Sequence, residues 1–572
     1  MSSTTAEAAG RKTWFGHPRG LAILFFAEMW ERFSFYGMRA LLVLYLTQHF
    51  LFSDDKAQGL YAAYASLVYL MPVVGGFIAD RYLGPRKAVL YGAVFLTLGH
   101  FGMAFEGSGS QQFLETGGVL YEVTAEGRGE DRILYLVDGE SPRSLQFSGE
   151  GVTVGGEGAA PSFIPTADYT QSVEQDPLYV QVLFFSLSLI IVGVGFLKAN
   201  ISTMVGALYE QGDPRRDPGF TIFYMGINLG SVIATSLCGF LGIAYGWKYG
   251  FGLAGFGMLL GLVTFLLGKP LLEGRGEPPK PIGLGLEGLT WIGGALALFP
   301  VFMLVQRDEL VSTTLTYLAP ALFLGIFLYS LVAFKAEVRS RMIVAIVLIV
   351  FSVLFWTLFE QAGSSLTLYA SRNSDLTIAP GIVMTSAQTN LFNPLLIVIL
   401  APVFAWLWQT LGKAGAEPST PVKFALALIQ VGAGFLVLVF GATNFASEVE
   451  TEAGVRILVP LIWLFLAYLL HTTGEICLSP VGLSMVTKLS APRVVGLMMG
   501  IWFLSSALAH TLAGLIAQAT SSQTIGGVVV DPRAQLATYV DVFTQIGWFA
   551  VGIGVVLLVV SPILRKGMAG VR

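Results

Sequence analysis

The sequence predicts an all-α protein that crosses a membrane many times, and three observations lead to this fold class. Of its 572 residues, 54% are apolar and 12% are charged, whereas soluble domains usually carry about 25% charged residues. The apolar residues fall into repeated runs of about 20 or more, long enough to cross a bilayer core of roughly 30 Å. Segment 1–18 is polar, and the apolar run 21–50 behind it is too long for a cleaved signal, so we expect a retained spanning helix.

Fourteen helices are expected along the chain. Many of their interiors contain Gly or other small residues, as in 250–261, which suits close contact between helices in lipid. The expected spans are 20–50, 57–81, 86–106, 178–208, 218–242, 248–268, 287–306, 313–335, 341–371, 382–411, 421–442, 455–487, 493–519 and 537–564.

Basic residues predict which ends of these helices face the cytoplasm, because short cytoplasmic loops carry an excess of Lys and Arg. Such residues follow the second helix, the fourth helix and the last helix, which all end on one side if the helices alternate. We therefore expect the tails 1–19 and 565–572 to be cytoplasmic. The residues concerned are Arg11, Lys12, Arg81, Arg86, Lys87, Arg215, Arg216, Arg565, Lys566 and Arg572.

The connection 107–177, between the third and fourth helices, is expected on the opposite, outer side. It is rich in Gly and acidic residues, and it contains short apolar runs such as 119–123 and 133–137. Runs of this kind separated by Gly and Asp are typical of hairpins. We expect a small β-rich extracytoplasmic insert, or else a partly ordered loop.

Several functional classes are disfavoured. The net charge of −4 points to no nucleic-acid partner. Cys238 and Cys477 both lie inside apolar runs, which indicates neither a disulfide framework nor a metal site. No HExxH motif, metal-ligand spacing or nucleophile–base arrangement is visible, so we expect no enzyme and no cofactor.

Charged residues inside the apolar runs are the main functional signal. Each would cost about 2.5–3.5 kcal/mol at the centre of a lone spanning helix, so we expect them to face a shared interior. At 100° per residue, Glu28, Arg32, Phe35 and Arg39 lie within about 60° of arc on the first helix. This ladder is roughly 16 Å long, and the alternative interpretation is a purely structural salt-bridge network. The seven residues are Glu28, Glu31, Arg32, Arg39, Lys198, Glu360 and Glu475.

The signs of these charges indicate a type of ligand. Four acids and three bases nearly balance, and a cavity with cations on one half and an acid on the other matches a zwitterionic peptide. The remaining carboxylates are free to bind and release protons. Because a nearby cation favours the charged form of a carboxyl, the arrival of a substrate can change its protonation.

The first helix also carries a recognisable motif. Residues 28–39 read Glu-Met-Trp-Glu-Arg-Phe-Ser-Phe-Tyr-Gly-Met-Arg, which resembles the ExxERFxYYG signature of the proton-dependent oligopeptide transporters, a branch of the major facilitator superfamily. Apart from the insert and the tails, the resemblance spans the chain. Its further stretches are 75–87, 198–202, 219–230, 359–361, 393–394, 474–480 and 500–504.

The resemblance implies a fold of two six-helix bundles, 20–268 and 341–564, joined by two additional helices within 287–335. It implies a proton-coupled symporter that imports di- and tripeptides by alternating access across a bacterial inner membrane. Its expected partners are small peptides, protons and the lipid bilayer, with no obligatory protein partner. The alternatives are a transporter of nitrate or another small anion, and a non-transporting peptide sensor.

The resemblance also assigns roles to residues. Glu28, Glu31 and Arg32 would form the proton-linked cluster of the first helix, and Glu360 a second titratable site near a gate. The peptide carboxylate would meet Arg39 and Lys198, and its amino end Glu475. Polar anchors and side-chain pockets would come from Tyr36, Tyr69, Asn228, Asn393, Trp502, Phe503 and Ser506.

Two positions depart from the family pattern. Phe35 stands where the family usually has Tyr, which puts one substrate contact in doubt. The position of a proton-linked histidine in animal members corresponds to Ala62. Four histidines are interpreted as structural, so coupling must rest on carboxylates. They are His49, His100, His471 and His510.

Overall fold

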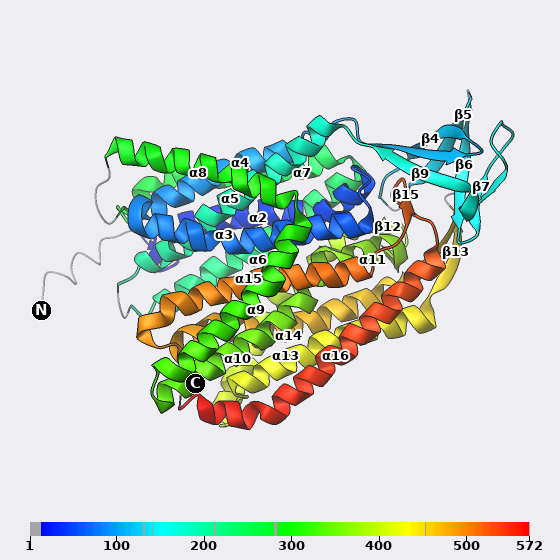
Figure 1. Cartoon of the computed structure of the whole chain (residues 1–572). Helices are drawn as coiled ribbons and strands as arrows, with labels where there is room; N and C mark the ends of the chain where they lie inside the picture. Colours follow the sequence, from blue (N-terminus) through cyan, green and yellow to red (C-terminus); the bar gives the residue numbers. More distant parts are fainter. Residues whose placement is uncertain are drawn as a thin grey trace, which may run out of the picture.

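The computed structural model describes residues 13–129, 132–139, 141–210, 213–278, 283–451 and 454–570. Most of the N-terminal tail, with Arg11 and Lys12, and the last two residues of the C-terminal tail, including Arg572, lie outside the described residues. Within them, long helices run side by side and a group of strands caps one end (Figure 1).

The first half of the chain forms a six-helix bundle. Helix α2 packs against α6 and α7, and α5 packs against α3 and α4. The helices are α2 (Gly20–Gln48), α3 (Asp54–Ile78), α4 (Gly84–Met103), α5 (Pro177–Ala207), α6 (Arg216–Ala244) and α7 (Trp247–Gly268).

The second half forms another bundle, and two helices link the halves. Helix α13 packs against α14 and α16, whereas the linking helices α8 and α9 pack against α5 and α15 respectively. The linking helices are α8 (Leu284–Val305) and α9 (Asp308–Ala333). The second bundle contains α10 (Ala336–Phe359), α11 (Ser365–Asn373), α12 (Phe392–Lys413), α13 (Thr420–Phe445), α14 (Leu461–Leu489), α15 (Val495–Ala519) and α16 (Pro532–Gly567).

The expected class of polytopic α-helical membrane protein is confirmed. In the described part of the chain, twelve helical stretches are long and apolar enough to cross a membrane. One of them, Asp54–Met103, contains both α3 and α4, joined through a π-helical turn. These twelve stretches thus hold thirteen of the fourteen expected helices. Helix α2 is the remaining one: its 29 residues are long enough to cross a membrane, but every 18-residue stretch of it holds at least three charged residues, so it is more highly charged than the others.

Several predicted boundaries were wrong, for local reasons. The span 455–487 begins at Leu461, because its first residues form a strand, and 382–411 begins at Phe392, after a 3-10 turn. The span 341–371 is interrupted by a 3-10 turn at Glu360–Gly363. The last helix starts five residues early because the Asp531 side chain accepts hydrogen bonds from two backbone N–H groups of its first turn, which stabilises that end. It also continues to Gly567, into the expected tail 565–572.

The insert is β-rich, as expected. Its strands form an antiparallel meander in the order β9-β3-β4-β5-β6, to which β7 and β8 add. Gly117 and Gly118 both have positive φ and join Thr116 to its partner Val119, the geometry of a two-residue hairpin loop. The strands are β3 (Gln111–Thr116), β4 (Val119–Glu126), β5 (Ile133–Asp138), β6 (Ser141–Ser148), β7 (Gly151–Val154), β8 (Phe163–Pro165) and β9 (Tyr169–Glu174).

Strands from the second half of the chain join this insert. The hairpin β13 (Ser447–Thr451) and β14 (Gly454–Pro460) extends the sheet, with β14 parallel to β6. A second hairpin, β15 (Thr524–Ile525) and β16 (Val528–Val529), lies between α15 and α16. All these strands gather at one end of the helices, and the C-terminus lies at the other end (Figure 1). We call the strand-bearing end the insert end.

Candidate functional site

A polar cavity of about 380 Å³ lies between the two bundles. Helices α2, α3, α5 and α6 line it from the first half, and α10, α12 and α14 from the second. Six of the seven intramembrane charged residues, all but Glu31, therefore face a shared interior, as the sequence predicts. The predicted site residues in its wall are Glu28, Arg32, Tyr36, Arg39, Tyr69, Lys198, Asn228, Glu360, Asn393 and Glu475.

Four predicted site residues do not line the cavity. Glu31 is completely buried behind it and pairs with Arg32. Trp502, Phe503 and Ser506 belong to α15 and are absent from the wall; the Ser506 hydroxyl donates to the backbone carbonyl of Trp502 within the same helix. In this conformation the side-chain pocket expected from α15 is not part of the cavity.

Arg32 is shared by two carboxylates of its own helix. Its Nε lies 3.1 Å from Glu28 Oε1, one turn away, and it also pairs with Glu31. All three side chains are buried, and among the described residues Glu28 Oε2 and both oxygens of Glu31 accept no hydrogen bond, although Glu31 Oε2 forms the ion pair with Arg32. A second cation, Lys198, lies 3.8 Å above the ring of Tyr69. Two buried carboxylates that share one guanidinium form a group able to take up a proton.

Phe35, the departure from the family pattern, packs beside this cluster. The Arg32 guanidinium lies 5.4 Å from its ring centre, and the ring is 4% exposed. The residue is not part of the cavity wall. Its ring provides a cation–π contact to Arg32.

Arg39 connects the two halves of the chain. It pairs with Glu360, which stands in the 3-10 turn after α10, and its Nε donates to the hydroxyl of Tyr61 at 2.7 Å. A Cβ on Gly363 would lie only 1.9 Å from that hydroxyl and 2.9 Å from Arg39 Nε. The turn therefore needs glycine at 363 to bring Glu360 to Arg39.

Glu475 stands in the second-half wall without a cation. Asn393 Nδ2 donates to Glu475 Oε2 at 2.8 Å and lies 3.1 Å from the hydroxyl of Thr472. Within the described residues, no basic side chain forms an ion pair with Glu475. The first half thus supplies cations to the cavity, and the second half supplies a carboxylate oriented by an amide.

One histidine that the sequence analysis interprets as structural lies beside Glu360. The Nδ1 of His510, in α15, is 3.8 Å from Glu360 Oε2, and its ring contacts that of Tyr69 at 4.6 Å between centres. A signal was available, because His510 is four residues after the predicted site residue Ser506 and so lies on the same helix face. His510 does not line the cavity itself, and wall residues that were not predicted include Tyr224, Trp356, Asn390 and Tyr468.

Two helical bundles around a central polar cavity are the architecture of secondary transporters of the major facilitator type. Comparison with known proteins defines the family: residues 86–531 match the POT family, and the chain belongs to it. It is 35% identical to the uncharacterized transporter YclF of Bacillus subtilis, with 99% of this chain and 98% of that protein covered.

Relatives with more informative names are also similar. The peptide transporter YePEPT of Yersinia enterocolitica is 32% identical, with 90% of each chain covered. Among solved structures, the crystal structure of peptide transporter POT in complex with sulfate has a TM-score of 0.74 and 32% identity, with both chains fully covered.

Proposed function

We propose that this chain is a proton-coupled symporter that imports di- and tripeptides by alternating access across a bacterial inner membrane, with its termini in the cytoplasm. The observation that carries the proposal is the division of charge in the cavity, with Arg39 and Lys198 from one bundle and Glu475 from the other. A peptide has a carboxylate and an ammonium about one peptide length apart. A single peptide can therefore bridge the two bundles.

Relatives support this substrate class. Peptide transporter YePEPT, by its name, carries peptides, and dipeptide and tripeptide permease A of Edwardsiella piscicida is 28% identical over 97% of this chain. A solved structure of peptide transporter POT contains alafosfalin. Nitrate or another small anion is disfavoured, because it leaves Glu475 without a role.

The Arg39–Glu360 pair suggests how protons are coupled. When a peptide carboxylate enters, Arg39 and Lys198 are the cations that can bind it. Arg39 then turns from Glu360, and an unpaired buried carboxylate is costly, so Glu360 takes up a proton. The peptide ammonium pairs with Glu475, which Asn393 already orients.

The conformation fits one state of an alternating-access cycle. At the insert end, Arg372 of α11 donates to both carboxylate oxygens of Asp54 at 2.5 and 2.7 Å, and Gln58 Nε2 of α3 donates to the backbone carbonyl of Ala517 of α15 at 2.7 Å. At the opposite ends of α3 and α15, Phe77 and Leu497 are exposed. The bundles are therefore joined at the insert end.

Uptake of labelled dialanine into proteoliposomes, with and without an inward proton gradient, tests the proposal. We expect accumulation that a protonophore abolishes. Equal accumulation with the protonophore would contradict coupling, and binding without any uptake would identify a sensor instead. Protease access to a tag on each terminus, in oriented vesicles, tests the cytoplasmic placement.

A further inference from the structure

His510 is surrounded by the charges of the cavity. Glu360 lies beside its Nδ1, and Tyr69 of α3 contacts its ring. The cations that interact with it electrostatically are Arg39 of α2 and Lys198 of α5. The side chain is 4% exposed. His510 therefore lies beside Glu360 Oε2, the same oxygen that pairs with Arg39, the partner that the proposed mechanism removes.

The chemistry of imidazole suits this place. When Arg39 turns to a peptide carboxylate, Glu360 needs either a proton or another cation. Imidazole is the side chain that changes charge between about pH 5 and 8, so it can accept a proton and pair with Glu360 as a cation, or stay neutral while Arg39 is present. Asn and Gln can donate a hydrogen bond there but cannot carry the proton.

We propose that His510 handles the coupling proton together with Glu360. The inference rests on the proposed symport. It assigns the proton not to Glu360 alone but to the Glu360–His510 pair, on the side of Glu360 that faces α15.

The variant H510Q tests this assignment, with H471Q as the matched control. His471 is also a buried histidine of the second bundle, but its Nε2 lies 3.1 Å from the backbone carbonyl of Val431 and its ring packs on Phe435. We expect H510Q to slow proton-driven uptake about tenfold or more, in line with the loss of a proton-transfer group, and to change its pH profile. Peptide counterflow should persist, and H471Q should keep the wild-type profile.

Two results separate failure of this inference from failure of the proposed function. If the wild type ignores a protonophore, symport itself is wrong. If the wild type is proton-driven and folded H510Q or H510N keeps its pH profile, the His510 assignment is wrong. The double variant E360Q/H510Q should be no worse than E360Q alone, because residues that act as a unit are not additive; additive losses would also overturn the assignment.

A different observation concerns the insert, which is attached to the first bundle at its root. Ser110 Oγ and Gln175 Nε2 both donate to the carbonyl of Phe50, at 2.9 and 2.6 Å, and Arg132 donates to the carbonyl of Gln48 at 2.6 Å. These carbonyls lie at the last residue of α2 and in its connection to α3. The insert therefore has to move with the first bundle.

The same insert docks on the second bundle. Ile525, in the hairpin between α15 and α16, is fully buried in the hydrophobic core of the insert together with Val530. The backbone N–H of Gly526 donates to Gln112 Oε1 at 3.0 Å. Residues of two bundles share one hydrophobic core here, so separation of the bundles at this end exposes apolar surface to water.

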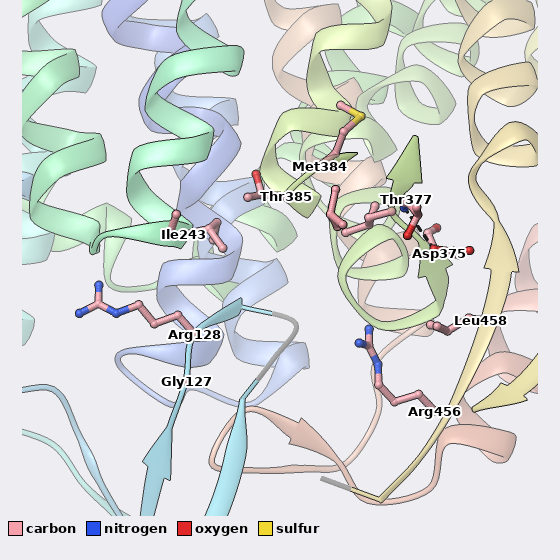
Figure 2. A pocket seen from close by; sticks show the side chains of 13 residues that line it. Gly127, Arg128, Ile243, Asp375, Thr377, Met384, Thr385, Arg456 and Leu458 are labelled. Atoms are coloured by element: carbon pink, nitrogen blue, oxygen red, sulfur yellow. Dashed lines mark hydrogen bonds between the residues drawn. The ribbon is translucent and has the colours of Figure 1, made fainter. Parts of the chain in front are cut away.

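The insert also forms part of a hollow between the bundles. A pocket of about 640 Å³ has Gly127 and Arg128 of the insert on one side and Arg456 and Leu458 of β14 on the other (Figure 2). We propose that the insert is a latch that holds the transporter closed at the insert end and must undock before this end opens. This second inference rests on alternating access.

A disulfide between the insert and α16 tests the latch. Asp531 Cγ, which occupies the place of the sulfur in a cysteine at 531, lies 3.1 Å from the position of a Cβ on Gly149. In a disulfide, the Cβ of one cysteine lies about 3 Å from the sulfur of the other. The variant G149C/D531C should cross-link on oxidation and lose uptake, and a reductant should restore it. Both natural cysteines are buried. The matched control is S144C/G155C, where Ser144 Oγ lies 2.4 Å from the Cβ position of Gly155 within the insert; its uptake should not respond to oxidation.

Each outcome decides the matter. If the cross-linked protein takes up peptide as fast as the same variant after treatment with reductant, the insert and the hairpin move together and there is no latch. If the cross-link does not form while the control forms, the docked contact is absent. If even the unoxidised wild type fails to transport dialanine, the proposed function is wrong, independently of the latch.

Discussion

Arg32 and Arg39 lie two turns apart on α2, and both pair with buried glutamates, but the two pairings connect different things. Arg32 binds Glu28 and Glu31 of its own helix, so this cluster can keep its geometry whatever the second bundle does. Arg39 binds Glu360, 321 positions away in the other bundle. Only the second pair can be made and broken by relative movement of the bundles, which makes it the better link between proton, peptide and conformation.

The largest expected effect is that of Arg39→Ala. It leaves Glu360 without its guanidinium and a bound peptide carboxylate underpaired, and removal of one partner of a buried pair typically costs about 3–5 kcal/mol. Peptide binding, measured by calorimetry on the purified protein, should fall accordingly.

An exposed Arg–Glu pair provides the matched control for Arg39→Ala. Arg533 Nε lies 2.9 Å from Glu448 Oε1, and both side chains are more than half exposed. Surface pairs contribute about 0–1 kcal/mol, so Arg533→Ala should bind peptide like the wild type. Wild-type affinity in Arg39→Ala contradicts the assignment of Arg39 to the carboxylate.

Glu360→Gln sharpens the comparison by removing the charge and keeping the shape. Gln cannot exchange a proton, so uphill uptake should be lost, whereas peptide counterflow, which needs no net proton movement, should continue. Glu448→Gln is the control and should keep both activities. If Glu360→Gln accumulates peptide at the normal rate under a gradient, the Arg39–Glu360 pair is only structural.

Asn393→Ala should have a smaller effect. It removes the amide that donates to Glu475 Oε2, and loss of a buried donor costs about 1–3 kcal/mol. Affinity for dialanine should fall, whereas N-acetyl-dialanine, which has no ammonium for Glu475, should already bind poorly and lose little more. Equal losses for both ligands would show that Asn393 does not act through the amino end of the peptide.

The sequence predicted the residues of this site better than their partners. Charged residues in apolar runs are costly unless they face a protein interior, and that single rule placed Glu28, Arg32, Lys198 and Glu475 in the cavity wall. The pairing of Arg39 with Glu360 depends on the packing of two bundles, which no local spacing contains. The position of His510 beside Glu360 was not predicted for the same reason, because it depends on the packing of α15 against the turn opposite.

The strands at the insert end show a second limit. Residues 454–460 read Gly-Val-Arg-Ile-Leu-Val-Pro and run directly into an apolar helix, and a short apolar run cannot be assigned to strand or helix by periodicity alone. Pro460 was the available signal, because proline favours the start of a helix, and α14 indeed begins immediately after it. The docking of Ile525 in the insert core had no signal in the sequence.

Replacement of 110–175 by a short Gly/Ser linker should have the smallest effect on binding. No predicted site residue lies within the insert, and α4 and α5, which it connects, pack directly against each other, so a short linker can join them without crossing the cavity. The variant should insert, fold and bind dialanine with wild-type affinity.

If the latch exists, the variant without the insert opens more readily at the insert end and its rate of peptide exchange rises, while its affinity for peptide stays the same. A lysine-containing peptide should associate more slowly, because it loses its attraction to the acidic insert, and added salt should remove this difference. A folded variant that binds no peptide would show that the insert belongs to the site itself.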